Sequence, residues 1–436
     1  MNSMHDEQTK ARFIEMNARE YGPIFNYINW ITEDRAKLAI QERARILQTP
    51  GISVSCLGTK IHHGPLSPGC LQCTGLAWSC LFISGRCNGR CFYCPTPQNM
   101  DDPPMSGSVP FHRAQDYADY VRFFGFGGAS VSGGEPFLDF NKSLAFVQAL
   151  RRTCDPALHI WLYTNGILVT QDKLQKLATA GLNEIRFDIG ATDYDLKFTR
   201  QAADIVATVT VEIPAVPEEA ERLEALLPEL TAAGVSHLNL HQLRLTPHNA
   251  RHLLEHDYTY IHGPKVTVLE SELCALGLLA RAAERKLKLA VNYCSFVYKY
   301  RFQAAASRNR FGVRLLENGE LLTDSGYIRT PATTPLVARA HSKRPTPGKK
   351  DQLETSPADG PAYAAAFVRA QANPEFLHRE ISVSADFTVF LERHPVRQEA
   401  DACASNPVPN PETANLYQPS LEESCERITP GLGVYF

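Results

Sequence analysis

Two hydrophobic periodicities alternate along the middle of this chain. Short runs rich in Val, Ile and Leu, typical of buried strands, are separated by stretches with apolar residues at helical spacing. The predicted strands cover residues 81–84, 128–132, 159–163, 184–189, 208–213, 237–243 and 287–293. The predicted helices cover residues 113–124, 141–153, 171–180, 193–207, 218–233 and 268–285. This alternation predicts an α/β fold of βα units around a parallel sheet, closed into a barrel or a partial barrel.

The two ends of the chain have other patterns. Residues 9–47 have helical composition and spacing with a break at Gly22-Pro23, which predicts a helical cap on the main domain. The expected domains are a helical region over 1–55, a Cys-rich metal-binding loop over 56–80, a barrel over 81–310 and an extension over 311–436.

The expected extension contains a β-hairpin. Asn318-Gly319 lies between apolar runs that start at Phe311 and end at Leu322, which is the usual pattern for a hairpin turn. Residues 380–391 read as a further strand, and residues 341–360 read as a surface linker because they are rich in Lys, Pro, Ser, Thr and Gly. Cys403 and Cys425, near the end, lack metal-ligand spacing.

Composition limits the classes of function. The chain has 436 residues, 44% hydrophobic and 21% charged, and a formal net charge of -3, so nothing in its overall charge favours nucleic acid or a membrane. The polar start lacks the apolar core of a signal peptide and no run is long enough to span a bilayer, which predicts a cytoplasmic protein. Its twelve cysteines are therefore expected to be metal ligands or buried thiols rather than disulfides.

Three cysteines lie close together in the segment Cys87-Asn-Gly-Arg-Cys91-Phe-Tyr-Cys94, directly after a predicted strand. A cubane iron–sulfur cluster takes four thiolates, so three in one loop leave one iron open for a substrate or cofactor. A structural zinc site is the alternative, since Cys-x2-Cys is also half of a zinc knuckle.

Four further cysteines precede this loop in a stretch rich in Gly and Pro, which predicts a loop rather than a helix. Cys56, Cys70, Cys73 and Cys80 would make a complete set of four thiolates for a second iron–sulfur cluster. The alternatives are a zinc or single-iron site, or fewer than four true ligands. His62 or His63 could replace one cysteine, although such a pair is more often polar loop surface.

Two other segments follow predicted strands and should meet the cysteine loop at the carboxyl edge of the sheet. They are Ser132-Gly133-Gly134-Glu135-Pro136 and Tyr163-Thr164-Asn165-Gly166. Glycines allow the backbone to approach a ligand closely, and Glu135 places a carboxylate there.

These three segments, in this order, resemble the radical S-adenosylmethionine (radical SAM) superfamily, as does the aromatic Tyr93 before the last cysteine. The resemblance implies a partial (β/α)6-type barrel with a [4Fe-4S] cluster on Cys87, Cys91 and Cys94. In that family the open iron chelates SAM, and cleavage of SAM gives a 5′-deoxyadenosyl radical that abstracts hydrogen from the substrate. It also implies that the SAM site includes Gly133, Gly134, Glu135, Pro136, Thr164 and Asn165.

Polar residues on the predicted strands are candidates for the interior. Arg186 and Asp188 share a face and could bind the SAM carboxylate and ribose, or could pair only with each other. Glu212 is a candidate for the SAM ribose or the substrate. His241 could face the substrate, although a satisfied core histidine is the more common case.

A more specific resemblance covers residues 81–308 and includes Tyr293-Cys294-Ser295. It is to uncharacterised proteins described as related to pyruvate formate-lyase activating enzyme. Cys294 could bind a second cluster, donate a hydrogen atom or be a buried thiol. Lys299 and Arg301 could bind an anionic substrate or pair with surface acids.

The sequence therefore predicts an oxygen-sensitive radical SAM enzyme, with its reaction class (oxidoreductase, lyase or transferase) left open. Its substrate is expected to be a small metabolite or cofactor precursor, and its electron donor a protein such as flavodoxin or ferredoxin. The alternatives are an activase of a glycyl-radical enzyme, a peptide- or protein-modifying enzyme, and a non-enzymatic metal-binding protein. Neither nucleic acid nor a membrane is an expected partner.

Overall fold

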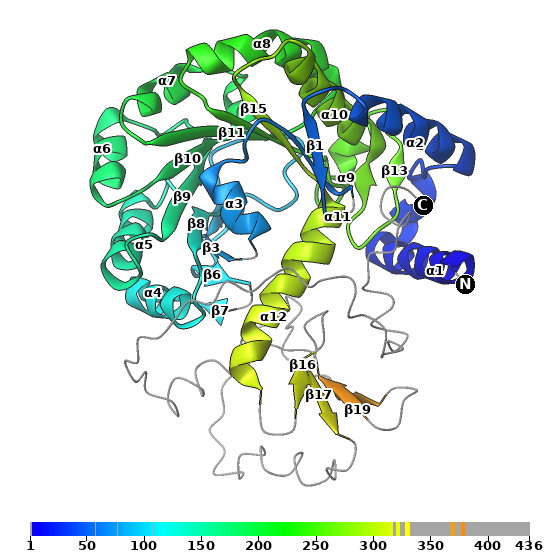
Figure 1. The fold of residues 1–436 in the computed structure, drawn as a ribbon, viewed down its shortest axis with the longest axis horizontal. Coiled ribbons are helices and arrows are strands. Elements are labelled where there is room, and N and C mark those ends of the chain that lie inside the picture. The colour runs from blue at the N-terminus through cyan, green and yellow to red at the C-terminus, as the bar shows by residue number, and fades with distance from the viewer. Residues whose placement is uncertain are drawn as a thin grey trace. The chain divides into compact units, whose positions relative to one another are not determined.

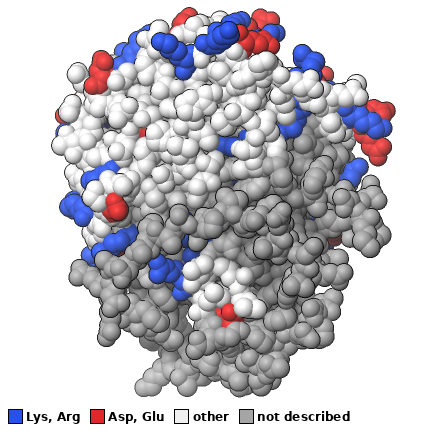
Figure 2. Space-filling view, viewed as in Figure 1, with Lys and Arg blue, Asp and Glu red and all other residues white. Residues whose placement is uncertain are grey.

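The computed structural model describes residues 2–56, 58–75, 77–107, 109–316, 320–322, 328–331, 368–370 and 376–379. The chain divides into two compact units between Ala304 and Ala305. Among the described helices, none combines the length and apolar character that crossing a membrane requires. Figure 2 shows Lys and Arg interspersed with Asp and Glu on the face in view, without a large patch of one sign.

A sheet with a long parallel section forms the centre of the first unit. In the described residues its order is β1-β2-β15-β12-β11-β10-β9-β8-β3-β6-β7. Seven neighbouring strands are parallel: β3 (Trp78–Phe82), β8 (Gly128–Ser132), β9 (His159–Thr164), β10 (Glu184–Phe187), β11 (Thr208–Pro214), β12 (His237–His241) and β15 (Ala290–Cys294). The predicted α/β class with a parallel sheet is confirmed, and these seven strands correspond to the seven predicted from the sequence.

Antiparallel strands flank the parallel section on both sides. They are β1 (Ile52–Ser55), β2 (Lys60–His63), β6 (Met105–Ser106) and β7 (Val109–Pro110). In the described part of the chain β1 and β7 end the strand order, so the sheet forms an open arc rather than a closed barrel.

Helices cover the outer side of this arc (Figure 1). They are α4 (Ala114–Phe123), α5 (Phe140–Thr153), α6 (Gln171–Thr179), α7 (Lys197–Ala203), α8 (Ala220–Ala232) and α10 (Leu269–Glu284). Each occurs where helical periodicity predicted one. In α6, for example, the side chain of Thr170 caps the first turn by accepting a hydrogen bond from the Lys173 N–H, and Leu174 and Leu177 are buried.

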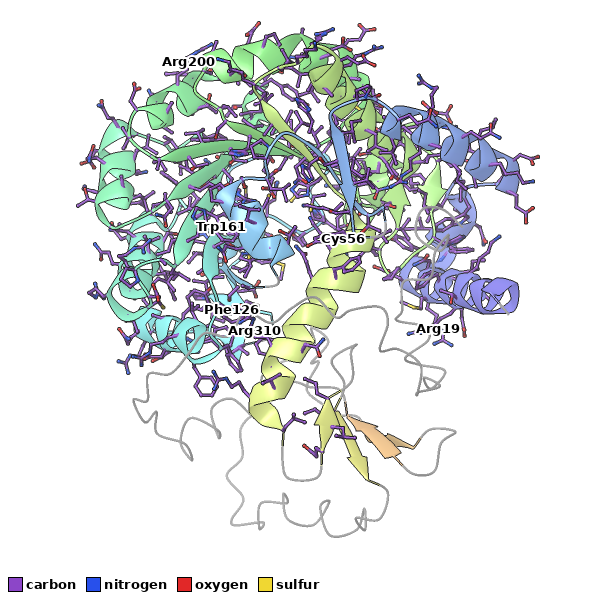
Figure 3. All side chains as sticks on the ribbon, in the orientation of Figure 1. Arg19, Cys56, Phe126, Trp161, Arg200 and Arg310 are labelled. Atoms are coloured by element: carbon purple, nitrogen blue, oxygen red, sulfur yellow. The ribbon has the colours of Figure 1, made fainter. Side chains whose placement is uncertain are left out.

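A short helix, α3 (Pro68–Thr74), lies inside the arc, where Figures 1 and 3 show it beside the strands and close to Trp161. The prediction of a loop for this stretch was wrong. Ser67 caps the helix by accepting from the Cys70 N–H at 3.2 Å, and proline is favoured in a first helical turn. Gly69 is required here, because a Cβ would lie 2.3 Å from Nη2 of Arg186.

The amino-terminal segment consists of α1 (Asn2–Tyr21), η1 (Gly22–Tyr27) and α2 (Glu33–Leu47). The predicted break is confirmed, since Gly22 has φ +52° and η1 begins with Gly22-Pro23. The Tyr21 hydroxyl donates to the carbonyl of Leu245 at 2.8 Å, and the Asn17 amide donates to the carbonyl of Gly263 at 2.9 Å. The segment thus packs as a cap on the chain between β12 and α10.

The remaining short elements of the first unit connect these layers. They are η2 (Ile189–Thr192), η3 (Pro217–Glu219), α9 (Ala250–Leu253), β13 (Tyr260–Ile261), β14 (Thr267–Val268), α11 (Phe296–Tyr298) and η4 (Lys299–Gln303).

The second unit contains a small antiparallel sheet of order β16-β17-β19-β18 in its described residues. Its strands are β16 (Leu321–Leu322), β17 (Ile328–Pro331), β18 (Val368–Ala370) and β19 (Phe376–Arg379). The predicted first arm of a hairpin is wrong, because residues 311–315 end the helix α12 (Ala304–Leu315). A short apolar run fits a helix as well as a strand, and the Ala-rich stretch before it favours the helix. The predictions for residues 318–319, 341–360, 380–391, 403 and 425 lie outside the described residues.

Candidate functional site

A tight loop carries the three clustered cysteines. It lies between β4 (Gly85–Arg86) and β5 (Asn99–Met100), which pair antiparallel. The Cys87 N–H donates to the Gln98 carbonyl at 2.9 Å, and the Cys94 N–H donates to the Cys91 carbonyl at 3.1 Å. β4 follows the parallel strand β3 directly, so the loop is at the carboxyl edge of the sheet, as predicted.

N–H groups point at the sulfur of Cys87. The backbone N–H of Gly89 lies 3.3 Å from Sγ, and the side-chain amide of Asn165 lies 3.7 Å from it. Donors of this kind stabilise thiolates that bind iron, so the loop fits the cluster that the sequence implies. Without bound iron, the thiols of Cys87 and Cys91 are protonated, because burial raises the pKa of Cys87 and raises that of Cys91 to about 12.

The Gly-Gly-Glu-Pro turn after β8 packs directly on this loop. The Gly134 N–H donates to the Ser84 carbonyl and the Glu135 N–H to the Arg86 carbonyl, both at 2.8 Å. A Cβ on Gly134 would lie 2.3 Å from the Arg86 carbonyl oxygen, and Gly133 has φ +148°. The glycines therefore allow the turn to touch the backbone that leads into the cysteines.

Glu135 joins its own turn to the segment after β9 through its carboxylate, and the residue is 2% exposed. Oε1 accepts hydrogen bonds from the Phe137 N–H at 2.8 Å and the Thr164 hydroxyl at 2.9 Å, and Oε2 accepts from the Asn165 N–H at 2.6 Å. Burial raises the pKa of Glu135, while these bonds oppose the rise. The residues predicted from separate motifs thus form one connected group beside Cys87.

Tyr93 lies against Asp188 rather than free in the loop. Its hydroxyl is 3.0 Å and 3.2 Å from the two carboxylate oxygens. Burial raises the pKa of Asp188 to about 6, against the hydrogen bonds from Tyr93 and the Gly190 N–H. The alternative in which Arg186 and Asp188 pair only with each other is wrong.

Two residues that the sequence did not single out hold the loop from the other side. The Asn249 amide donates to the carbonyls of Tyr93 and Arg244, each at 3.0 Å. The Thr246 hydroxyl donates to the Pro95 carbonyl at 3.0 Å. Thr-Pro-His-Asn reads as an ordinary turn, and nothing in it signals these contacts.

A chain of charged groups crosses the interior of the arc. Arg186 Nε lies 2.8 Å from Glu184 and its Nη1 lies 2.6 Å from Glu212. Glu212 is 2.6 Å from Nε2 of His241, whose Nδ1 is 3.0 Å from Nζ of Lys299. Two carboxylates already bind Arg186, so its role in SAM binding stays a prediction, as does that of Glu212.

His241 has a partner on each ring nitrogen, which fits the satisfied histidine of the sequence analysis. Lysine can only donate, so the ring proton lies on Nε2 and is donated to Glu212. Cys294, 8% exposed, is near both His241 and Lys299. Burial by itself would raise the pKa of Cys294, but Lys299 and Lys60 lower it to about 6. The side chain of Arg301 lies outside the described residues.

The four cysteines predicted as a second metal set are on three different elements. Cys70 and Cys73 are on α3, Cys80 is on β3, and Cys56 follows β1 with φ +50°. Across the described residues, no three His, Cys, Asp or Glu side chains gather as ligands of a single ion would. A second site therefore stays a prediction.

Comparison with known families identifies the domain. The model of the Radical SAM superfamily matches residues 81–212, which include the cysteine loop, the Gly-Gly-Glu-Pro turn and β9 to β11. Residues 81–212 form a radical SAM domain. A [4Fe-4S] cluster and SAM are the cofactors that this family implies.

Relatives of this radical SAM enzyme are named for different functions. A putative glycyl-radical enzyme activating enzyme of Methanocaldococcus jannaschii is 28% identical over 279 residues, 60% of this chain and 72% of that protein. A GTP 3′,8-cyclase of Desulforamulus reducens is 27% identical over 113 residues, and the match spans 34% of its length.

Solved structures give weaker matches to this radical SAM enzyme. SuiB of Streptococcus suis bound to S-adenosylmethionine has a TM-score of 0.38 and 12% identity, over 69% of this chain and 72% of that one. Methylornithine synthase has a TM-score of 0.36 and 13% identity, over 63% and 77%.

Proposed function

We propose that this enzyme holds a [4Fe-4S] cluster on Cys87, Cys91 and Cys94 and cleaves SAM there. The bound cluster would supply the electron that splits SAM into methionine and a 5′-deoxyadenosyl radical, which abstracts hydrogen from a substrate. A reduced flavodoxin or ferredoxin would be the electron donor. This proposal excludes the alternative of a non-enzymatic metal-binding protein, because the family that matches is one of enzymes.

One observation supports this proposal most strongly. The Glu135 carboxylate fixes the backbone N–H of Asn165, and the side chain of Asn165 in turn lies against Sγ of Cys87. This places Gly133, Gly134 and Thr164 within the same connected group. These residues, together with Tyr93 and Asp188, would hold a SAM molecule at the loop.

The substrate that the interior favours is a small molecule. α3 occupies space inside the arc, which leaves less room for a protein loop (Figure 1). The interior also holds polar and charged groups, with His241, Lys299 and Cys294 at or near the carboxyl ends of β12 and β15. Lys299 would bind an anionic group of this substrate, and Arg301 is proposed for the same role from the sequence.

The second candidate is activation of a glycyl-radical enzyme or modification of a peptide. The relative from M. jannaschii, named as a putative activating enzyme, favours it because that match covers more of this chain than the cyclase match does. The two candidates differ in which part of a cell extract contains the substrate.

The test is anaerobic and uses the full chain reconstituted with iron and sulfide. With dithionite and SAM, we expect 5′-deoxyadenosine by liquid chromatography, none from Cys91→Ala, and wild-type amounts from Cys154→Ala, which removes a thiol outside the site. Faster release with the small-molecule fraction of an extract supports a metabolite, whereas faster release with the protein fraction supports an activase. No product from a fully iron-loaded wild type would refute SAM cleavage.

A further inference from the structure

Lys60 is a buried ammonium group without a hydrogen-bond acceptor. It lies on β2, opposite Cys294 of β15, and is 1% exposed. Within the described residues its Nζ has no hydrogen-bond partner, although it lies 5.0 Å from the ring centre of Tyr298. Burying an ammonium group costs several kcal/mol unless an anion compensates it, so this position calls for a negative charge.

Three thiols lie near this ammonium group. Lys60 interacts electrostatically with Cys294, and then with Cys70 and Cys73 of α3. None of the three forms a disulfide, and Cys70 and Cys294 are buried. They come from segments far apart in the sequence, and the fold brings them together inside the arc.

Hydrogen-bond donors point at two of these sulfurs. The Gln303 amide donates to Sγ of Cys73. The Asn292 amide and Nη2 of Arg186 each lie 3.8 Å from Sγ of Cys70. Such N–H groups around sulfur are the usual outer contacts of thiolates that bind iron.

Binding of Cys70 to iron would not leave Oδ1 of Asn239 without a partner. In the protonated state its thiol donates to Oδ1 of Asn239 at 3.5 Å. That oxygen also accepts a hydrogen bond from the Asn292 amide at 3.0 Å, so it keeps a partner when the thiol proton is lost.

We propose that Cys70, Cys73 and Cys294 bind a second iron–sulfur cluster, whose negative charge Lys60 compensates. Three thiolates in one place with a cation beside them suit a cluster, in which each thiolate binds a different iron. Compared with the sequence-based set, the assignment replaces Cys80 by Cys294 and leaves out Cys56, which is not among the thiols that interact with Lys60. Cys80 is a β3 residue that hydrogen-bonds to Ser130 and interacts with Glu212 and Arg186 instead of with the other thiols.

The test separates this cluster from the one that would cleave SAM. In the full chain, the variant Cys87→Ala/Cys91→Ala/Cys94→Ala removes the first cluster, so any iron–sulfur signal that remains belongs to a second one. We expect this variant, reconstituted anaerobically, to retain iron and sulfide and to give a Mössbauer spectrum of a cluster. Adding Cys294→Ser should abolish that signal, whereas adding Cys80→Ser or the control Cys274→Ser should preserve it.

Circular dichroism and a thermal melt check that each variant is folded. A folded triple-alanine variant without iron would overturn the proposal, as would loss of the signal with Cys80→Ser and its survival with Cys294→Ser. Neither result would bear on SAM cleavage, which is measured on the wild type. As a further readout, Lys60→Met should shift the reduction potential of the second cluster to more negative values, and Lys60→Arg should restore it.

Discussion

Glu135 accepts a 2.6 Å hydrogen bond from the backbone N–H of Asn165, across two neighbouring parallel strands. The same carboxylate binds the N–H of its own turn and the Thr164 hydroxyl, and Asn165 continues the contact to Cys87. The carboxyl ends of β8 and β9 and the cysteine loop are therefore one hydrogen-bonded unit. Disturbing one member should move the others.

Replacing Glu135 with Gln tests this connection. A Gln amide group cannot accept from both the Asn165 N–H and the two donors on Oε1, so a buried donor loses its partner. We expect the free energy of unfolding to fall by about 1–3 kcal/mol. SAM affinity, measured by calorimetry on the reconstituted protein, should fall as well.

The matched control is Glu221→Gln, which makes the same change on the exposed surface of α8. It should leave both quantities within error of wild type. Unchanged SAM affinity in a folded Glu135→Gln protein would show that the carboxylate is not needed at the cofactor site.

Gly134 tests how closely the turn must approach the loop. A Cβ there would lie 2.3 Å from the Arg86 carbonyl oxygen, so Gly134→Ala must push the turn away from β4. Backbone groups on both sides constrain this position, since the N–H of Gly134 is also bound to Ser84. We expect at least a tenfold lower rate of 5′-deoxyadenosine release, equivalent to about 1.4 kcal/mol in the barrier.

Gly277→Ala gives the opposite expectation for the same chemical change. Gly277 is inside α10, and a Cβ there meets nothing within 4 Å. Ala has a higher helix propensity than Gly, so this variant should gain about 0.5–1 kcal/mol of stability and keep wild-type release of 5′-deoxyadenosine. An active Gly134→Ala protein would mean that the close approach is not required.

Asn249 should matter to the site although it is remote from the motifs. Asn249→Ala removes the donors to the carbonyls of Tyr93 and Arg244, and so frees one side of the cysteine loop. We expect lower iron occupancy after reconstitution and slower SAM cleavage. The neighbouring His248 is exposed, and His248→Ala should change neither. Equal iron contents in the two variants would contradict this role.

The sequence predicted what depends on local pattern. Strands and helices from β8 to α10 followed from periodicity, and the edge motifs came together because parallel strands end on the same side. Glu135, Thr164 and Asn165 could be named for that reason. Their direct hydrogen bonds to one another could not, since they depend on the register between β8 and β9.

The interior was harder to predict. Nothing in the segment around Cys70 indicated that its helix would enter the arc and place Gly69 against Glu184. The pairing of β2 with β15, which sets Lys60 opposite Cys294, joins residues more than two hundred positions apart. Such contacts depend on tertiary packing, which local propensity does not encode.

Glu184 allows the buried ion pair to be tested by pH. The carboxylate is fully buried, and burial by itself would raise its pKa. Arg186, His159 and the Gly69 N–H outweigh burial and hold the pKa at about 2, below the ordinary 4.5. Because the folded-state value is depressed, the stabilisation is present above about pH 4.5 and is lost as the pH falls toward 2.

We therefore expect Glu184→Gln to lower the free energy of unfolding by about 3 kcal/mol at neutral pH, since Arg186 then loses one of its two carboxylates. The loss should shrink as the pH falls from 4.5 to 2, because the wild type gives up the same contribution there. Urea titrations across this range measure it, with Glu229→Gln on the exposed side of α8 as the control. A difference between wild type and Glu184→Gln that stays constant with pH would show that the carboxylate stabilises the fold by its shape and hydrogen bonds and not by its charge.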